Sequence, residues 1–503
     1  MTKFHKQSLS PELRDLACSI GEAAKKEGLD FFDTIFEVVD HETLNAAAAY
    51  HGFPNRYPHW RWGMHYDRLA KTYRYGLSTI YELVINTNPS YAYLLDSNPL
   101  VLQKTVMAHV YGHVDFFKNN YWFSKTNRKM LDQMASHASS IRKIQEDIGQ
   151  EEVERFIDYS LSLDNLIDIH SPFKRPVVSE AGEGQVTHPA KLQAKKYMDS
   201  YVNPKDVLAA KQQEIDNFRQ QKKHFPVRPE RDVLQFLLAH APLSEWQKKV
   251  LDIIRTEAYY FAPQAQTKIL NEGWASYWHS KIMTSVHPLE PSEIVDFCDL
   301  HAGVVAESGH NLNPYRLGIE LLRYAKKRWD EGKFGIKYLS YDDPKQRRDH
   351  LIPTQLGASK IFEIRKWHND VTFIDEFLDE DFCHEHKMFV YQYDPKQKKR
   401  VITSRDFGPI KQQLLDSITN LGQPIIEVTD GNYKNRGELL LCHRFAGEER
   451  SMEQAKQTLE ALYHLWSRGV HIASQVAGKK VVLSFDGSEH HQDIGDAVVQ
   501  EAS

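Results

Sequence analysis

The chain has 503 residues, which is too long for one compact core, so we expect two domains or one large domain with an appendage. Hydrophobic residues make up 41% and charged residues 26%, as in an ordinary soluble globular protein. The net charge of -5 gives no electrostatic case for nucleic acid as the main partner, and no run approaches the ~20 apolar residues of a membrane span.

The four cysteines are scattered and form no C-x-x-C pair: Cys18, Cys298, Cys383 and Cys442. This pattern argues against a disulfide scaffold and favours reduced thiols. The first residues, "MTKFHKQSLSPELRDLACSI", carry charges where a signal peptide needs an apolar stretch. The sequence therefore predicts a cytoplasmic protein.

The N-terminal quarter is predicted to contain two helices, a loop and a strand. Ser10, followed by Pro11, caps a helix over residues 9–27, and a second helix is predicted over 30–51. Residues 53–69, rich in Trp, His and Arg, are predicted to form a loop. Residues 78–89, "STIYELVINTNP", are typical of a strand that ends in an Asn-Pro turn.

Pro99 is expected to open the next helix, whose apolar stripe recurs every three or four residues and includes His109 and His113. Both imidazoles should therefore face the interior. Further helices are expected to about residue 168 and again from 233 to about 331. The polar segment 180–235 between them is predicted to be a solvated insertion.

The last third alternates candidate strands with two amphipathic helices, at 407–420 and 452–468, in the order ββαββαββ that is typical of a separate α+β domain. The candidate strands are 387–394, 399–404, 424–431, 437–445, 470–476 and 479–487.

Two histidines four residues apart on one helix project from the same face, about 6 Å apart, and can reach one metal ion. "MAHVYGH" places His109 and His113 at this spacing. The alternative is a pair of buried histidines that bond to carbonyl or carboxylate groups.

The later stretch "LNEGWASYWH", residues 270–279, resembles the L-N-E-G-F-A segment in which gluzincin aminopeptidases carry their third zinc ligand. The matching carboxylate is Glu272. Two histidines and one glutamate form a frequent catalytic zinc set with a fourth position open to water. The resemblance also implies a zincin-like build, in which a substrate lies along an edge strand just ahead of the histidine helix, here 78–87.

The overall expectation is an α+β protein: a large, mainly helical, zincin-like domain followed by a smaller C-terminal α+β domain with antiparallel strands. The predicted boundaries are 1–345 for the helical domain, which includes the insertion at 180–235, 346–490 for the C-terminal domain and 491–503 for a disordered tail.

One departure from the zinc peptidases concerns proton transfer, because Val110 occupies the position of their general-base glutamate. Another residue would have to replace it. The candidates are Asp115, Glu82, His279, and the 307–318 run "ESGHNLNPYRLG". His279 lies seven residues after Glu272, about 10 Å along a helix, so we expect it beside the ligands rather than among them.

The 307–318 run gathers polar side chains around a predicted helix start at Pro314. His310 or Tyr315 could steady an oxyanion and Arg316 a substrate carboxylate. The alternative is a capped surface loop. The candidate catalytic residues are thus Asp115, His279, His310 and Tyr315, and the candidate substrate-binding residues are Glu82, Asn119, Asn313 and Arg316. Asn119 could equally cap the histidine helix.

Five motifs in order, "NRYPHWRWGMHYDRL", "YELVINTNPSYAYLL", "MAHVYGHVDFFKNN", "LNEGWASYWH" and "NLNPYRLGIELL", resemble the stage V sporulation protein R family over nearly the whole chain. The resemblance implies a bacterial cytoplasmic protein needed for normal spore cortex formation. It also implies an association with a serine protein kinase and a partner of that kinase in stationary-phase or stress physiology. It assigns no reaction.

The sequence thus supports a cytosolic zinc-dependent hydrolase that cleaves an amide or peptide bond in a peptide or a peptidoglycan-precursor-like substrate. We expect no nucleic-acid partner and no membrane span. Two other classes stay open. One is a non-enzymatic scaffold derived from a metalloprotease, and the other is a different metal chemistry, such as iron-dependent oxidation on the same ligand set.

Overall fold

The computed structural model describes residues 6–74, 82–174, 198, 202–221, 225–287, 289–306, 313–340, 351–394, 399–444, 452–476 and 479–494. The chain forms two compact units, each assembled from two segments. The first unit is Met1–Gln150 with Tyr260–Gly422, and the second is Glu151–Tyr259 with Gln423–Ser503. Each unit is considered separately below.

This division differs from the predicted boundary between residues 345 and 346. The helices that follow that boundary bury side chains such as Ile361, Phe373 and Phe382 in the main core of the first unit, together with the histidine helix. The change from helical to strand-like sequence patterns near residue 345 therefore does not coincide with a boundary between two hydrophobic cores. Residues 491–494 of the predicted disordered tail belong to a strand, and the rest of that tail lies outside the described residues.

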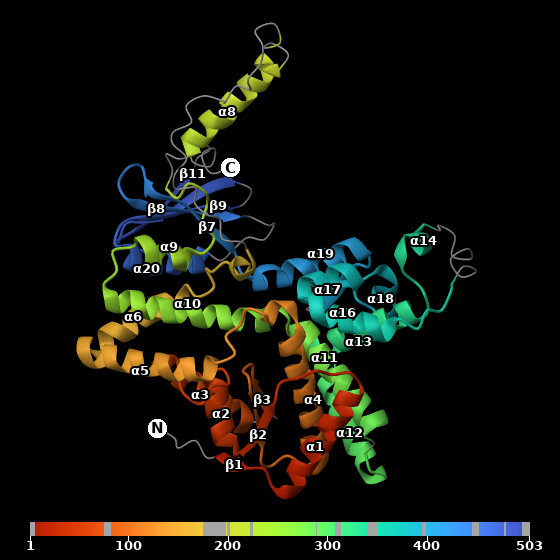
Figure 1. The fold of residues 1–503 in the computed structure, drawn as a ribbon. Coiled ribbons are helices and arrows are strands. Elements are labelled where there is room, and N and C mark those ends of the chain that lie inside the picture. The colour runs from red at the N-terminus through yellow and green to blue at the C-terminus, as the bar shows by residue number, and fades with distance from the viewer. Residues whose placement is uncertain are drawn as a thin grey trace. The chain divides into compact units, whose positions relative to one another are not determined.

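The first unit is mainly helical. Its helices are α1 Pro11–Lys26, α2 His41–Ala49, α3 Trp60–Arg74, α4 Leu100–Asn119, α5 Met130–Ile148, α11 Lys268–Lys281, α12 Ile294–Val305, α13 Pro314–Asp330, α14 Gly335–Leu339, α16 Gly357–Trp367, α17 Asp370–Phe377, α18 Glu380–Glu385 and α19 Phe407–Ile418 (Figure 1). Its strands are β1 Lys6–Ser8, β2 Thr34–Val39, β3 Glu82–Ile85, β4 Ser90–Leu95, β5 Val390–Asp394 and β6 Lys399–Ser404.

Four strands of the first unit form a mixed sheet in the order β1-β2-β4-β3. The central pair β2–β4 is parallel, because α2 and α3 lie between the two strands in the chain. β3 pairs antiparallel with β4 and lies at the edge of the sheet, and in the chain it precedes β4 and then α4. The predicted edge strand at 78–87 is therefore present over Glu82–Ile85, and residues 75–81 lie outside the described part.

Two N-terminal predictions were wrong. The single helix predicted over 30–51 is a strand, β2, followed by a helix, α2, whose first turn is capped by the Asp40 carboxylate at 2.7 Å from the Thr43 amide. The β-branched run of β2 favours a strand, and the Asp40 cap starts a new helix. The loop predicted over 53–69 is helical from Trp60 onwards, in α3.

The second unit combines helices with a C-terminal sheet. Its helices are α6 Gln150–Ser162, α8 Lys205–Gln221, α9 Val233–His240 and α20 Met452–Trp466, and α10 Glu245–Gln266 contributes to both units. Its strands are β7 Ile425–Tyr433, β8 Glu438–Arg444, β9 Val470–Val476, β10 Lys479–Phe485 and β11 His490–Ile494. Together, the mainly helical first unit and this C-terminal sheet confirm the α+β class.

The C-terminal sheet has the order β11-β10-β9-β8-β7. Its neighbours pair antiparallel except β8 and β9, which are parallel, so the prediction of antiparallel strands was wrong for this pair. The cause is α20, which lies between β8 and β9 in the chain and returns it to the starting end of the sheet. The predicted strands at 387–394 and 399–404 form a separate hairpin, β5–β6, in the first unit.

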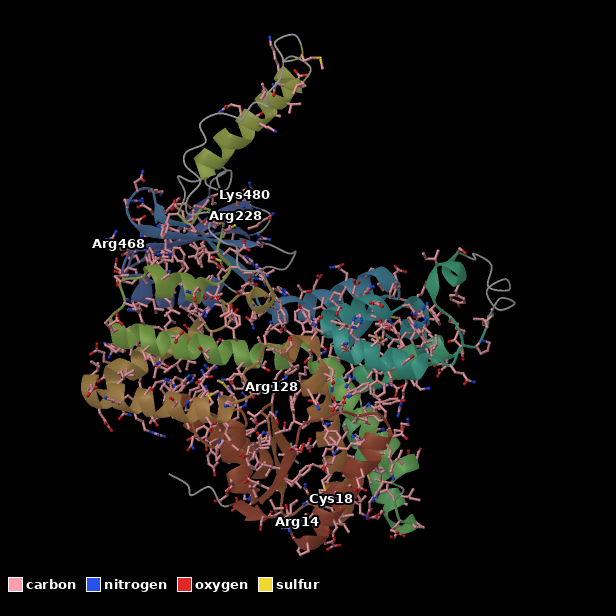
Figure 2. The ribbon with its side chains drawn as sticks, in the orientation of Figure 1. Arg14, Cys18, Arg128, Arg228, Arg468 and Lys480 are labelled. Atoms are coloured by element: carbon pink, nitrogen blue, oxygen red, sulfur yellow. The ribbon has the colours of Figure 1, made fainter. Side chains whose placement is uncertain are left out.

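Arg128, labelled in Figure 2, ties the end of β3 to the end of α4. Its guanidinium donates to the backbone oxygens of Phe117, at 2.7 Å, and Phe123, at 3.1 Å, and to the side chain of Asn86. Burial lowers the pKa of Arg128 to about 10, which leaves it charged at neutral pH. These bonds fix the edge strand relative to the histidine helix.

Among the described residues, none of the helices is both long enough and apolar enough to cross a bilayer.

We expect the stability of the first unit to fall as pH rises from about 4 to 7 through Asp370. Burial raises the pKa of this carboxyl to about 7, although it accepts hydrogen bonds from the amides of Ile269 and Leu270 at the start of α11. A carboxyl whose pKa is higher in the folded than in the unfolded chain favours folding when protonated. Its contribution should therefore decrease by up to about 1.4 kcal/mol per pH unit within this window.

Asp370→Asn should remove this part of the pH dependence, and Asp370→Ala should in addition lose about 1–2 kcal/mol of capping. Urea unfolding at several pH values, followed by the fluorescence of the buried Trp274 and Trp278, measures both effects. An unchanged pH slope in Asp370→Asn would contradict the assignment.

Candidate metal centre

The candidate centre begins with α4, a helix buried on nearly all sides. Every residue from Val101 to Phe117 is buried, so α4 is a central helix of the first unit rather than a surface helix. His109 and His113 are 6% and 5% exposed, and their ring centroids lie 4.5 Å apart. The predicted inward orientation of both imidazoles is confirmed.

Glu272 reaches the two histidines from α11. Its Oε2 atom lies 3.5 Å from His109 Nε2 and 3.4 Å from His113 Nε2. One ligand atom from each of the three residues fits within 4.8 Å of the others. Across the ranges that the structure describes, this is the one group of three such side chains with that convergence.

Glycines bring the helices close enough for this convergence. A Cβ atom on Gly112 of α4 would lie 2.8 Å from Ala275 Cα of α11. A Cβ atom on Gly273 would lie 2.4 Å from the carbonyl carbon of Gly318 on α13. Real Cβ atoms do not approach backbone this closely, so these contacts require glycine, and they place α11 between α4 and α13.

The second nitrogen of each imidazole is already occupied. His113 Nδ1 lies 3.0 Å from Asn271 Oδ1, and His109 Nδ1 lies 2.9 Å from His279 Nδ1. Because an amide oxygen only accepts, His113 carries a proton on Nδ1, which leaves Nε2 as the atom that faces Glu272. Bonds of this kind orient histidine ligands and raise their basicity.

The contact chain continues from His279 to α12, where His279 Nε2 lies 3.1 Å from His301 Nδ1. If His109 presents an unprotonated Nε2 to an ion, its Nδ1–H donates to His279, which in turn donates through Nε2–H to His301. Burial, together with the nearby imidazoles of His109 and His301, holds the pKa of His279 well below its usual range. A neutral His279 fits this relay. Its place next to a ligand, rather than among the ligands, agrees with its spacing in the sequence.

The electrostatics of the cluster favour an ionised carboxylate. Burial opposes ionisation of Glu272, but the adjacent imidazoles of His113 and His109 hold its pKa well below the usual range. Burial also opposes protonation of His113, yet the Glu272 carboxylate raises the pKa of that imidazole. The carboxylate therefore remains available to a cation.

One further observation supports the binding of a metal ion by these three ligand atoms. Glu272 Oε2 is buried and has no hydrogen-bond partner, although it is the oxygen that faces both Nε2 atoms. A buried carboxylate oxygen without a partner is costly, and a cation held by these three atoms would satisfy it.

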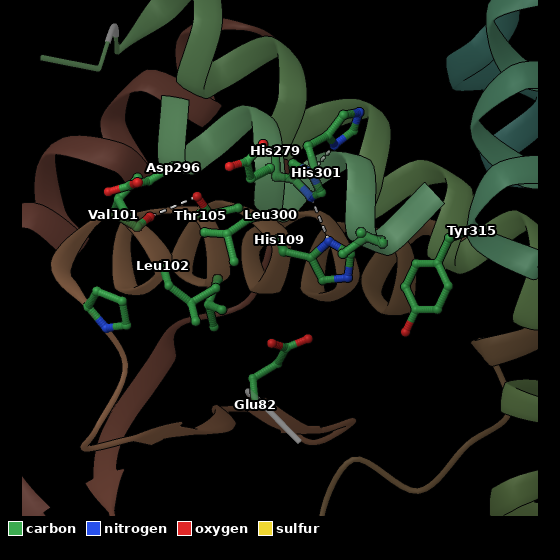
Figure 3. Close-up of a pocket in the computed structure, with 15 residues that line it drawn as sticks. Glu82, Val101, Leu102, Thr105, His109, His279, Asp296, Leu300, His301 and Tyr315 are labelled. Carbon is green, nitrogen blue, oxygen red and sulfur yellow. Dashed lines mark hydrogen bonds between the residues drawn. The ribbon is translucent and has the colours of Figure 1, made fainter. Parts of the chain in front are cut away.

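A cavity of about 810 Å³ opens beside the cluster, and Glu82, His109 and Tyr315 line it (Figure 3). Glu82 comes from the edge strand β3, and Figure 3 shows its carboxylate pointing toward the His109 ring. Burial raises the pKa of Glu82, and the Glu272 charge adds to this, against the opposing effect of His109 and His113. This carboxyl beside the cluster is thus held less acidic than usual.

Tyr315 lies on the first turn of α13, with its ring stacked 6.3 Å from that of His109. Burial raises the pKa of its hydroxyl, as do the charge of Glu272 and a hydrogen bond to that carboxylate. The phenol therefore keeps its proton and can donate it in a hydrogen bond.

Asp115 does not face the cluster. Its carboxylate accepts from the Asp30 amide at 2.7 Å, from Trp274 Nε1 at 2.8 Å and from the Arg365 guanidinium at 2.8 Å. It is a fully buried tie between α4, α11 and α16, so its candidacy as a catalytic residue was wrong. Two residues after His113, its side chain leaves the helix about 200° around from that imidazole.

The predicted substrate-binding amides are caps. Asn119 donates to the backbone oxygens of Asp30, at 2.7 Å, and Asp115, at 2.8 Å, at the end of α4. Asn313 is the N-cap of α13, where it accepts from the amides of Tyr315 and Arg316. Both amides are committed to backbone groups, which corrects their assignment to substrate.

The other two residues of that loop are less informative. Arg316 follows Tyr315 in the first turn of α13 and does not line the cavity. His310 lies outside the described residues.

Sequence reasoning missed three contributors: Asn271, His301 and the glycine pair Gly273–Gly318. Asn271 and Gly273 stand on either side of Glu272 in the quoted motif, so their proximity to a candidate ligand was a usable signal. His301 carried no local signal.

Two comparisons with known proteins identify relatives. A family profile described as "SpoVR like protein" matches residues 8–423. "Uncharacterized protein YcgB" of Escherichia coli (strain K12) is 28% identical over 483 residues, which cover 91% of this chain and 90% of that protein. No solved structure matches the chain.

Gly273→Ala should destabilise the first unit by at least about 1–3 kcal/mol and disturb the cluster, because the added methyl group would overlap the α13 backbone. Thermal unfolding compares it with Gly63→Ala in α3, where an added Cβ meets nothing within 4 Å. That control should be neutral or slightly stabilising, since alanine favours a helix over glycine. Equal stability of the two variants would show that the close approach is absent.

Proposed function

The chain belongs to the SpoVR-like protein family, and we propose that it is a zinc-dependent hydrolase of an amide or peptide bond. His109, His113 and Glu272 hold the metal in this proposal. The observation that carries it is the convergence of two Nε2 atoms and a partnerless Oε2 atom, with one Nδ1 held by Asn271 and the other by His279. Such a shell orients ligands for an ion, and no other described group in the chain offers it.

Three protein ligands leave one coordination position for water or substrate, as in catalytic rather than structural zinc sites. Bound there, zinc would supply Lewis acidity and make water a better nucleophile at neutral pH. The protein supplies the ligand geometry and the groups that move protons around it.

Glu82 is the proposed general base. It faces the ligands from the opposite side of the cavity, and its raised pKa brings a carboxylate closer to neutral pH, where proton transfer is most efficient. It takes the proton of the attacking water and delivers it to the leaving nitrogen. Tyr315, whose phenol stays protonated, donates a hydrogen bond to the oxygen that gains charge.

The presence of Val110, in place of the general-base glutamate of the zinc peptidases, is consistent with a base on β3. Val110 is completely buried within the main apolar core, so its side chain is not available to the cavity. A carboxylate at this position would be desolvated without a partner. The absence of a glutamate after His109 therefore does not argue for an inactive relic, because the edge strand offers another.

The setting of the reaction rests on family membership, which links the chain to sporulation. Within that, we propose a role in spore cortex formation through a cytosolic precursor or peptide, together with a serine protein kinase and its associated protein. The zincin-like build is likewise part of the proposal. It is supported by the edge strand β3 before the histidine helix and by the glutamate on a later helix.

Metal analysis tests the centre directly. Protein purified without chelator should carry about one zinc per chain, and His109→Ala or Glu272→Ala should lose it. Asn271→Ala should lower the affinity about 10–100-fold, because His113 loses its orienting acceptor. His384→Ala, at a side chain that is 61% exposed on α18, is the control and should keep the metal. Folded, metal-free wild-type protein would end the proposal, and stoichiometric iron would redirect it to oxidation chemistry.

Glu82→Gln separates catalysis from metal binding. Cleavage of a peptide panel, read by mass spectrometry, should fall about 10²–10⁴-fold while the zinc content stays unchanged. Glu42→Gln, on the exposed first turn of α2, is the matched control. If wild-type protein that holds zinc cleaves no peptide or amide, a non-enzymatic scaffold becomes the better account. Full activity in Glu82→Gln would remove Glu82 from its role.

A further inference from the structure

The cavity beside the cluster extends well beyond the reacting groups. Figure 3 shows Tyr315 and Asp296 at opposite ends of the drawn side chains, with His109 and Glu82 between them. Glu82, His109 and Tyr315 mark the reacting end. The volume of about 810 Å³ exceeds what a water molecule and a single carbonyl group need.

One wall of the extension is the first half of α4. Leu102, Val106 and His109 line the cavity at helical spacing, with Val101 and Thr105 beside them. The seven steps from Leu102 to His109 span about 10 Å at 1.5 Å per residue. This wall offers apolar contact over two turns, with no charged group before His109 is reached.

The other wall is α12, which changes character along its length. Asp296 and Asp299 line the cavity from the first half of the helix, whereas Leu300 and Val304 line it from the second half. Both aspartates are exposed at the mouth of the cavity. The part of the cavity lined by the first half of α12 therefore carries two acidic side chains.

The lining residues include no lysine or arginine to offset these acidic groups. The nearest lysine on α4, Lys104, is held by both oxygens of Glu293 at 2.8 and 2.9 Å, so its charge is already balanced. The lining imidazole of His301 is uncharged at neutral pH, because burial and the nearby Arg323 lower its pKa. Arg323 is itself paired with Glu320 at 2.9 Å, so the lining does not favour an anionic ligand end.

We infer that the substrate is an amide or peptide with an aliphatic side arm that ends in a primary ammonium group, the arm matching the two turns of α4 from Leu102 to His109, about 10 Å. The arm lies along Leu102 and Val106, and the ammonium group pairs with Asp296 and Asp299. This inference rests on the proposed function for the position of the carbonyl. The preference for an ammonium group at Asp296 and Asp299 depends only on the residues that line the cavity.

Binding of three ligands of equal length tests the cation without requiring activity. Hexylamine, hexanol and hexanoate are titrated into the full chain and followed by NMR, both as purified and after chelator treatment. Hexylamine should bind at least about fivefold tighter than hexanol, and hexanoate should bind most weakly. The advantage of the amine should shrink between low and high salt, because the carboxylates lie at a solvent-exposed mouth.

The double variant Asp296→Asn/Asp299→Asn should bring hexylamine to the level of hexanol. Glu146→Gln/Asp147→Asn, at exposed positions of α5, removes the same charge elsewhere and should leave the preference intact. Equal binding of amine and alcohol by wild-type protein, stronger binding of hexanoate, or no binding of any ligand would each overturn the inference. Chelator-treated protein gives the same readout, so this failure is distinct from a missing metal or a lack of hydrolysis.

Discussion

The close backbone contacts of α11 with α4 and α13 are the constraint on which the rest of the site depends. A glutamate has a short reach, so Glu272 meets two imidazoles on α4 only because Gly112 lets the helices touch at Ala275. On its other side, Gly273 meets Gly318 and draws in the first turn of α13, which carries Tyr315. The glycines inside the sequence motifs are therefore as necessary to the cluster as the ligands beside them.

The second constraint is the satisfaction of buried polar groups. Around the cluster, Asn271 and His279 each occupy one ring nitrogen of a histidine, and Asp370 caps the start of α11. Glu272 Oε2 is one of the buried side-chain atoms without a hydrogen bond, and it faces the Nε2 atoms of both ligand histidines. A buried carboxylate oxygen that has no hydrogen bond and faces two oriented imidazoles supports the proposed metal site more strongly than the number of ligand atoms alone.

Much of this was predictable from local pattern and some was not. The stripe on α4 predicted the inward histidines, and the similarity of "LNEG" to a known ligand motif singled out Glu272. Periodicity could not show that α16 and α17 share the core of α4, because that depends on contacts between distant segments, and so the boundary near 345 was misplaced. Asp115 was misjudged for the same reason, since its partner Arg365 lies 250 positions along the chain.

The proposed base, Glu82, lies on a strand and not on the helix that carries the histidine ligands, and this affects the mechanism. In a helix-borne arrangement, ligand and base share one rigid element, whereas here Glu82 belongs to the edge of the sheet and faces His109 across the cavity. A substrate that fills the cavity must therefore lie between the ligands and the base, with its carbonyl toward the metal in the proposed reaction. The bonds of Arg128 near the ends of β3 and α4 then matter for chemistry as well as stability, because they set the distance between base and ligands.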